Sequence, residues 1–168
     1  MDHLWSPWRF GYVTKGEPPP GCVFCQARDL PDAESLVVFE GATCYIILNR
    51  YPYTSGHLMV VPNRHVAALS ALTRDEMNEV GRRAQECEMA LTEACQPHGF
   101  NVGVNLGAPA GAGVRDHLHL HVVPRWTGDA NFMTVVGDTR VLPEELGTSA
   151  ARLRPIFAKI SGASAPKP

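Results

Sequence analysis

The sequence predicts a single α+β domain built on a mainly antiparallel, five-stranded sheet, with one long helix and a shorter C-terminal helix. Two stretches of the chain contain β-branched runs bounded by turn residues, and the segment between them has apolar residues at helical spacing. Strands that lead into one long helix and then resume favour α+β over alternating α/β architecture. With 168 residues, the chain can bury the core that one such domain needs.

The predicted domain spans residues 22–160 and lies between an N-terminal arm and a tail. Residues 1–21 hold the aromatic segment LWSPWRFGYV and then TKGEPPPG, whose three consecutive prolines favour a stiff, extended connector. Residues 161–168, SGASAPKP, are expected to form a flexible tail.

Three strands are expected between Leu36 and Pro62. The runs LVVFE, TCYIIL and HLMVV are rich in β-branched residues. Glu40-Gly41 separates the first two runs, and NRYPYTSG, whose Pro and Gly favour a turn, separates the second from the third.

The long helix is predicted to begin at Thr73, because Thr73 to Glu76 fits a capping box. Apolar residues from Met77 to Ala94 recur at spacings of three and four, and Pro97-His98-Gly99 is expected to follow the end of the helix.

Two further strands and a second helix are expected in the last third of the chain. FNVGVN and HLHLHVV predict the fourth and fifth strands, the latter by strict alternation. A glycine-rich segment from Gly107 to Gly113 separates them. The second helix is expected within 143–160, beginning at Pro143 with Glu144 and Glu145 near its positive end.

The composition excludes some classes of partner. A formal charge of -2 and a pI near 6.4, without a basic stripe, argue against a nucleic-acid partner. The sequence contains neither a signal-like segment nor an apolar run long enough to cross a bilayer, so we expect a soluble, cytoplasmic protein without a membrane partner. Five cysteines in such a chain favour reduced thiols.

The segment DHLHLHVVPR holds the most informative pattern. On a strand, His117, His119 and His121 would share one face, about 7 Å apart along the chain, while the intervening apolar residues face the core. The proximity of the imidazoles disfavours their simultaneous protonation, because like charges repel. At least one ring should therefore be neutral and able to act as nucleophile, base or metal ligand. The alternative is a solvated polar face with incidental metal affinity.

Two other segments carry weaker signals. The small residues of Gly107 to Gly113 could let backbone N–H groups approach a phosphate, although a glycine-rich stretch is often only a turn. Cys22 and Cys25 have the spacing of a metal half-site, but a redox pair or two buried cysteines would have the same spacing.

HLHLHVV resembles the signature of the histidine triad (HIT) superfamily, whose members transfer or hydrolyse nucleotidyl groups. LWSPWR, GCVFC, LNRYPYTSGHLMVVP, GAGVRDHLHLHVVPRW and GDANFM extend the resemblance to the bacterial branch that includes diadenosine tetraphosphate phosphorylase-like proteins. The resemblance implies a HIT-like fold, a homodimer and an adenine dinucleoside polyphosphate or an AMP derivative as substrate. Aromatic residues in the N-terminal arm are also compatible with contact to a partner subunit.

The resemblance assigns roles to individual residues. It implies that His119 attacks the α-phosphorus to form a nucleotidyl-histidine, with His117 in the same catalytic row. His121 would contact the phosphate or the bridging oxygen, and His57 would lie near the nucleophile. For His57, a polar residue at the start of a strand is the alternative.

The resemblance also implies a set of substrate-binding residues. Asn49 would bind ribose hydroxyls, unless it serves only the turn, and Asn105 would contact the phosphate side. The remaining candidates follow from position and residue type, because they flank the triad and could contact phosphates or the second nucleoside: Gly111, Ala112, Gly113, Arg125, Trp126 and Asn131.

One departure from the family pattern concerns the residues before the histidines. Many triad proteins have Gln followed by Ser or Thr there, whereas this chain has GAGVRD from Gly111 to Asp116. This difference weakens a transfer of the phosphoramidase mechanism and favours the phosphorylase-like branch.

Triad relatives that carry the cysteine pair use two histidines to complete a zinc site. The corresponding residues here are His65 and His117, so Cys22, Cys25, His65 and His117 are the candidate ligands of a structural zinc ion.

The expected reaction is phosphorolysis of diadenosine tetraphosphate to ADP and ATP, with phosphate as co-substrate and a nucleotidyl-His119 intermediate. Two alternatives remain open: a hydrolase of adenosine phosphoramidates or adenylylated adducts, and a nucleotide-binding module with little turnover.

Overall fold

A computed structural model gives the structure of the protein and describes residues 21–31, 34–129 and 144–162. Residues 1–20 of the predicted arm, most of the predicted tail, Pro143 and Asn131 lie outside the described residues. The helices and strands, in chain order, are α2 (Val23–Gln26), β1 (Val37–Glu40), β2 (Cys44–Leu48), β3 (Leu58–Pro62), the 3₁₀ helix η1 (Leu69–Ala71), α3 (Arg74–Cys95), β4 (Gly99–Val104), the 3₁₀ helix η2 (Ala108–Ala110), β5 (Leu120–Arg125) and α5 (Leu146–Ile160).

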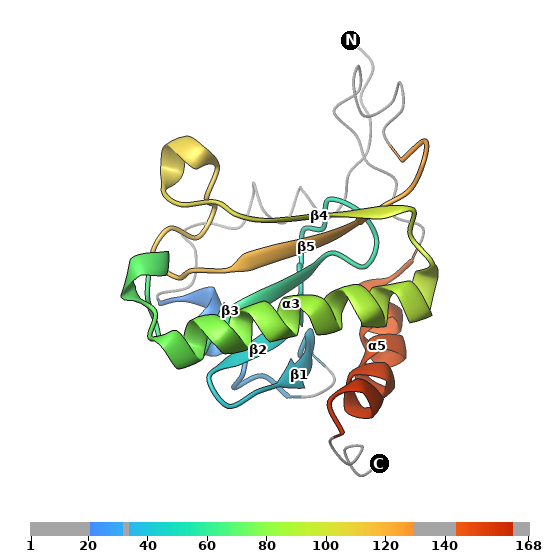
Figure 1. Cartoon of the computed structure of the whole chain (residues 1–168), viewed down its shortest axis with the longest axis horizontal. Helices are drawn as coiled ribbons and strands as arrows, with labels where there is room; N and C mark the ends of the chain where they lie inside the picture. The colour runs from blue at the N-terminus through green and yellow to red at the C-terminus, as the bar shows by residue number, and fades with distance from the viewer. Residues whose placement is uncertain (1–20, 32–33, 130–143, 163–168) are drawn as a thin grey trace.

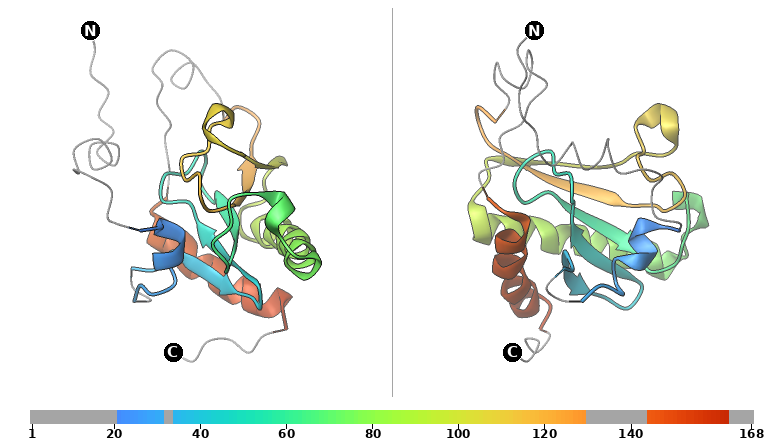
Figure 2. Two further views of the ribbon diagram at one scale, coloured as in Figure 1. Left: turned by 90° about the vertical axis from the view of Figure 1, so that its left-hand side faces the viewer. Right: turned by 180° about the vertical axis from the view of Figure 1, so that it is seen from behind.

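The strands form one antiparallel sheet in the order β1-β2-β3-β5-β4. The helix α3 lies across one face of this sheet, with α5 beside it (Figure 1). The short helix α2 lies on the opposite face, as the side view in Figure 2 shows. The α+β fold class, the five-stranded sheet, the long helix and the C-terminal helix predicted from the sequence are confirmed.

The ends of α3 follow from local sequence. Thr73 accepts a hydrogen bond from the Glu76 amide at 3.2 Å, and the Glu76 carboxylate accepts one from the Thr73 amide at 2.7 Å. At the other end Gln96 is left-handed, with φ at 46°, which ends the helical path before Pro97. No helix in the described part of the chain is long and apolar enough to cross a membrane.

The core has two parts because β2 and β3 are buried on both faces. On one face, apolar side chains of the sheet pack against α3 and α5, including Ile46, Leu91 and Phe157. On the other face, Phe24 of α2 packs with Tyr45 and neighbouring sheet residues. The α2 segment thus covers the β2–β3 half of that face.

The fifth strand begins later than predicted. It starts at Leu120, so His117 and His119 lie in the segment before it. The ladder between β3 and β5 ends at the Val60–Leu120 pair, and Pro62, two residues further along β3, has no N–H with which to continue it. The Pro62 carbonyl instead accepts a hydrogen bond from the His117 ring, at 2.8 Å.

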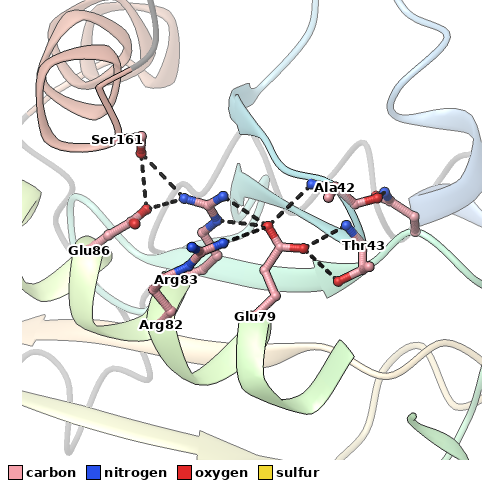
Figure 3. A network of polar contacts seen from close by, with 8 residues as sticks. Ala42, Thr43, Glu79, Arg82, Arg83, Glu86 and Ser161 are labelled. Carbon is pink, nitrogen blue, oxygen red and sulfur yellow. Dashed lines mark hydrogen bonds and ion pairs between the residues drawn. The ribbon is translucent and has the colours of Figure 1, made fainter. Parts of the chain in front are cut away.

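A buried ionic network joins α3 to the turn between β1 and β2 (Figure 3). The Glu79 carboxylate accepts hydrogen bonds from the amides of Ala42 and Thr43, the Thr43 hydroxyl and the Arg83 guanidinium. Arg83 also pairs with Glu86 at 2.6 Å, and Glu86 accepts a hydrogen bond from Ser161 at the end of α5. The network therefore fixes both helices to the edge of the sheet.

Candidate active site

The histidine row lies on the sheet face opposite α3. His121 is paired with Met59 and Gly103 across the sheet, and Met59 belongs to the core cluster under α2. Residues directly opposite one another in an antiparallel pair share a face, so the imidazole of His121 is on the α2 side. His57, His117, His119 and His121 are all buried.

The orientation of His119 is defined by the backbone of its neighbour. Its Nδ1 is 2.9 Å from the carbonyl oxygen of His117, and a carbonyl can only accept a hydrogen bond. Nδ1 therefore carries the proton, and the lone pair of neutral His119 is on Nε2. Phe24 packs against the same ring, with centroids 4.8 Å apart, so the ring is held from two directions.

His121 is connected to His57. Nε2 of His57 lies 2.9 Å from Nδ1 of His121, and both rings are buried. Nε2 of His121 is buried and has no hydrogen-bond partner among the described residues. The rings of His119 and His121 are 4.8 Å apart and nearly perpendicular.

Burial keeps the row uncharged. Desolvation lowers the pKa of His121 to about 4, and the nearby His119 lowers it further in the same direction. Desolvation also lowers the pKa of His119, although the hydrogen bond to the His117 carbonyl partly opposes this shift. Both imidazoles are thus neutral at pH 7, the state in which one nitrogen keeps a lone pair.

A groove of roughly 290 Å³ opens beside the row on the β4–β5 half of the sheet. His121 and Gly103 contribute to its lining, and Tyr53 and Arg125 border it. Asn105, predicted to face phosphate, also lines it. The groove lies where α2 does not cover the sheet and can accommodate a chain of phosphates that extends from His121.

The glycine-rich segment bonds largely to itself. Gly107 and Gly111 have φ of 81° and 88°, a conformation that glycine adopts readily. The Ala110 and Ala112 amides donate to the Gly107 carbonyl, and the Gly111 amide donates to the Ala108 carbonyl. These three amides are used by hydrogen bonds within the turn. Among the described backbone hydrogen bonds, none involves the Gly113 amide as a donor.

The Asn49 side chain contacts His57. Its Oδ1 accepts a hydrogen bond from the Tyr51 amide at 2.9 Å, and its Nδ2 is 3.3 Å from Nδ1 of His57. The side chain thus takes part in the turn, one of the two roles considered from the sequence, and it also reaches the histidine cluster.

Arg125 already has acidic and amide partners. Its guanidinium binds Asp129 through two hydrogen bonds of 2.6 and 2.7 Å and donates to Asn101 at 2.7 Å. The Trp126 amide also donates to Asp129, at 3.1 Å. Asp129 therefore competes with any phosphate for the Arg125 side chain.

The four candidate metal ligands meet as the resemblance implied. The donor atoms of Cys22, Cys25, His65 and His117 all lie within 4.8 Å of one another. The His117 Nδ1 is 3.2 and 3.5 Å from the two sulfurs, and the His65 Nδ1 is 3.4 Å from Cys25. Ligands of tetrahedral zinc would have nitrogen–sulfur separations of about 3.5 Å. The donor set and its dimensions therefore fit zinc.

Several site residues were not predicted from the sequence. Phe24 contacts the His119 ring, Tyr53 and Asn101 line the groove, and Asp129 holds Arg125. Phe24 lies between the two cysteines, so its position beside the metal half-site was a usable signal. Asn101 reaches the groove through the pairing of β4 with β5, whereas Tyr53 and Asp129 each lie four residues from the side chain they contact and depend on loop geometry.

Comparisons with known proteins agree with this geometry. The HIT domain model matches residues 31–128. The AP-4-A phosphorylase of Mycobacterium tuberculosis is 44% identical over 154 residues, which cover 87% of this chain and 79% of that protein. The resemblance noted from the sequence is thereby confirmed.

Solved structures agree with the fold. A Zn-bound histidine triad family protein from Mycobacterium smegmatis matches with a TM-score of 0.67 and 30% identity, covering 85% of this chain and 97% of that one. A hypothetical histidine triad nucleotide-binding protein from Sulfolobus tokodaii matches with a TM-score of 0.68 and 25% identity, covering 83% and 94%. The chain therefore belongs to the histidine triad (HIT) family, in the branch that contains the mycobacterial AP-4-A phosphorylase.

Proposed function

We propose that the protein is a nucleotidyltransferase that cleaves diadenosine tetraphosphate by phosphorolysis, with His119 as the nucleophile. The observation that carries this proposal is the hydrogen bond from His119 Nδ1 to the His117 carbonyl, which leaves the Nε2 lone pair available in a buried, neutral ring. The relationship to AP-4-A phosphorylase supports the choice of substrate.

The reaction consists of two displacements. His119 Nε2 attacks the α-phosphorus, the bond to the bridging oxygen breaks, and ATP leaves while AMP stays bound to the imidazole. Inorganic phosphate then attacks the same phosphorus, the P–N bond breaks, and ADP leaves with His119 regenerated. Diadenosine tetraphosphate and phosphate thus become ATP and ADP.

The groove along β4 and β5 is the proposed subsite for the leaving nucleotide. It begins at His121, whose Nε2 is buried and without a partner among the described residues, and it extends to Arg125. We propose that His121 contacts the bridging oxygen, that Asn105 and the amide of Gly113 contact phosphate oxygens, and that Arg125 and Trp126 bind more distal parts of the substrate.

Zinc is the proposed ion of the Cys22, Cys25, His65 and His117 cluster. With four protein ligands it would have no open position for water, so its contribution is structural. The ligands would connect α2 to the segment that precedes β5. His117 contributes its ring to this cluster and its carbonyl to His119.

Product analysis tests the reaction. Purified protein should convert diadenosine tetraphosphate to ATP and ADP only when phosphate is present. Release of AMP without phosphate would identify a hydrolase of AMP derivatives instead. Binding of a nonhydrolysable dinucleotide without turnover across the substrate panel would identify a nucleotide-binding module.

Substitution of the nucleophile is the first specific prediction. His119→Asn should reduce turnover by at least about a thousandfold, because it removes the attacking nitrogen but keeps a polar side chain of similar reach. Mass spectrometry of a rapidly quenched reaction should detect nucleotidyl-His119 in the unchanged protein only. Products that accumulate without any adduct would refute the covalent route.

The protein is also proposed to be a homodimer, as the family resemblance implies. Light scattering of the full chain should give about twice the mass of 18.3 kDa. A mass equal to that of one chain at working concentrations would contradict this proposal.

A further inference from the structure

We propose that the Asn49 side chain and the peptide N–H of Tyr53 are positioning groups that fix the protons of the His57–His121 pair. In this arrangement His121 always presents Nε2–H, and never a lone pair, to the leaving group. The inference rests on the proposed nucleotidyl transfer at His119, and it adds the class of leaving group that the site handles.

The first step is the state of His57. The Tyr53 amide is 3.1 Å from His57 Nδ1, and a peptide N–H can only donate, so Nδ1 accepts and carries no proton. Asn49 supports the same protonation state of His57, because its Oδ1 is already used to accept a hydrogen bond from the Tyr51 amide. The amide nitrogen of Asn49 therefore faces His57 Nδ1, at 3.3 Å.

The second step derives the position of the proton on His121 from that on His57. A neutral His57 without a proton on Nδ1 has its proton on Nε2. That proton is donated to His121 Nδ1, 2.9 Å away. Nδ1 of His121 is then the acceptor, so the remaining proton of neutral His121 is on Nε2.

The third step is the direction of that proton. His121 Nε2 is buried and has no partner among the described residues, and His121 lines the groove. A buried donor without a partner is destabilising, and a bound substrate that accepts from it would relieve this cost. Neighbouring rings thus offer the two groups that displacement needs: a lone pair on His119 and an N–H on His121.

The arrangement selects leaving groups that depart as anions, such as a polyphosphate. A neutral imidazole can stabilise the charge on a departing oxygen through a hydrogen bond. It cannot transfer its only proton without becoming an imidazolate, and His57 has no second proton to replace it. An amine leaving group needs a full proton in order to depart, so we expect its departure to be assisted less than that of an anion.

The direct test is the protonation of His121 in the full-length protein at pH 7. Nitrogen-15 NMR of the histidine side chains distinguishes protonated from unprotonated ring nitrogens, and His121→Asn identifies the signals by their loss. We expect the proton on Nε2 of His121 and on Nε2 of His57. A proton on Nδ1 of either ring would overturn the proposal, whatever reaction the protein catalyses.

Kinetics of Asn49→Ala provide the second test, with the phenyl and p-nitrophenyl esters of AMP as probes. The two esters share one nucleotide and differ in the basicity of the leaving group. Loss of the Asn49 amide should slow the phenyl ester by about fivefold and the p-nitrophenyl ester by less than about twofold, because a hydrogen bond matters more to the more basic oxygen.

The matched control is Asn78→Ala, the same change at an exposed position on α3, which should affect neither ester. A role for Asn49 only at the ribose, or a general disturbance of the loop, would slow both esters equally and would overturn the proposal. Failure of phosphorolysis itself would appear in the product analysis, while the NMR result would stand independently.

Discussion

At the scale of single residues, the three imidazoles of the triad differ because their nitrogens have different partners. His117 uses both nitrogens, one toward the Pro62 carbonyl and the other toward the sulfurs. His119 uses one nitrogen to bond the His117 carbonyl and keeps the other available, and His121 is hydrogen-bonded to His57 through Nδ1. Identical side chains are thus suited to three different proposed roles: metal ligand, nucleophile and hydrogen-bond donor.

The pKa of His121 leads to a prediction about pH. Desolvation, and then the proximity of His119, lower this pKa to about 4, so His121 should stay neutral as the pH falls from 8 to 5. Its side-chain NMR shifts should remain constant over this range, where an ordinary histidine would titrate near 6.5. A titration midpoint near 6.5 would contradict the prediction.

Asp129 offers a second prediction at this scale. Its carboxylate neutralises Arg125 at the border of the groove, so Asp129→Asn should make the guanidinium more available to a polyphosphate. We expect KM for diadenosine tetraphosphate to fall by roughly two- to fivefold, the size expected for one exposed ion pair, and the gain to shrink in high salt.

Asp75→Asn, at an exposed position on α3, removes the same charge far from the groove and serves as the control. An equal fall in KM in both variants would indicate a general effect of net charge. An unchanged KM in Asp129→Asn would exclude Arg125 from substrate binding.

At the scale of elements, Glu79 links α3 to the turn between β1 and β2. Burial raises the pKa of this carboxyl, but the hydrogen bonds from Thr43, Arg83 and Ala42 outweigh burial and lower it to about 2. The charged form therefore stabilises the fold above the ordinary pKa of about 4.5, and this contribution disappears as the pH falls from about 4.5 to 2.

Glu79→Gln should lower the free energy of unfolding at pH 7 by roughly 3 kcal/mol, because buried Arg83 loses one of its two carboxylate partners. Urea denaturation should show the difference between the two proteins shrinking as the pH falls below about 4.5. Glu93→Gln, which breaks the exposed pair with Lys159, should cost less than about 1 kcal/mol. Equal losses in the two variants would contradict the assigned role of the network.

The metal cluster gives the second prediction at the scale of elements. Cys22→Ser should reduce bound zinc, measured by elemental analysis, and lower Tm, because the ligands join α2 to the segment before β5. Cys95→Ser removes a thiol that lies outside the cluster and should leave the metal content unchanged. Full zinc occupancy in Cys22→Ser would exclude this ligand set.

At the scale of the whole molecule, periodicity predicted the fold well because it reports which side chains face the core. The capping box at Thr73 and the β-branched runs of β2 and β3 are local signals, and all three elements lie where expected. The start of β5 was placed too early because alternation alone cannot register that Pro62, on another strand, ends the ladder.

The candidate site was predictable to the extent that its residues lie in short motifs. The cysteine pair and the histidine row are such motifs, and their convergence with His65 came from the family resemblance. The Arg125–Asp129 pair and the hydrogen bonds around His57 depend on loop geometry and distant pairing. No periodicity in the sequence encodes those contacts.

His117 participates in both centres through different atoms. Its ring belongs to the cysteine cluster, whereas the oxygen that orients the nucleophile belongs to the main chain and exists whatever side chain stands at that position. A substitution at residue 117 would therefore remove the proposed ligand without deleting the atom that orients the proposed nucleophile. A protein with this scaffold could thus lose the proposed zinc ion and still keep the His119 ring aligned.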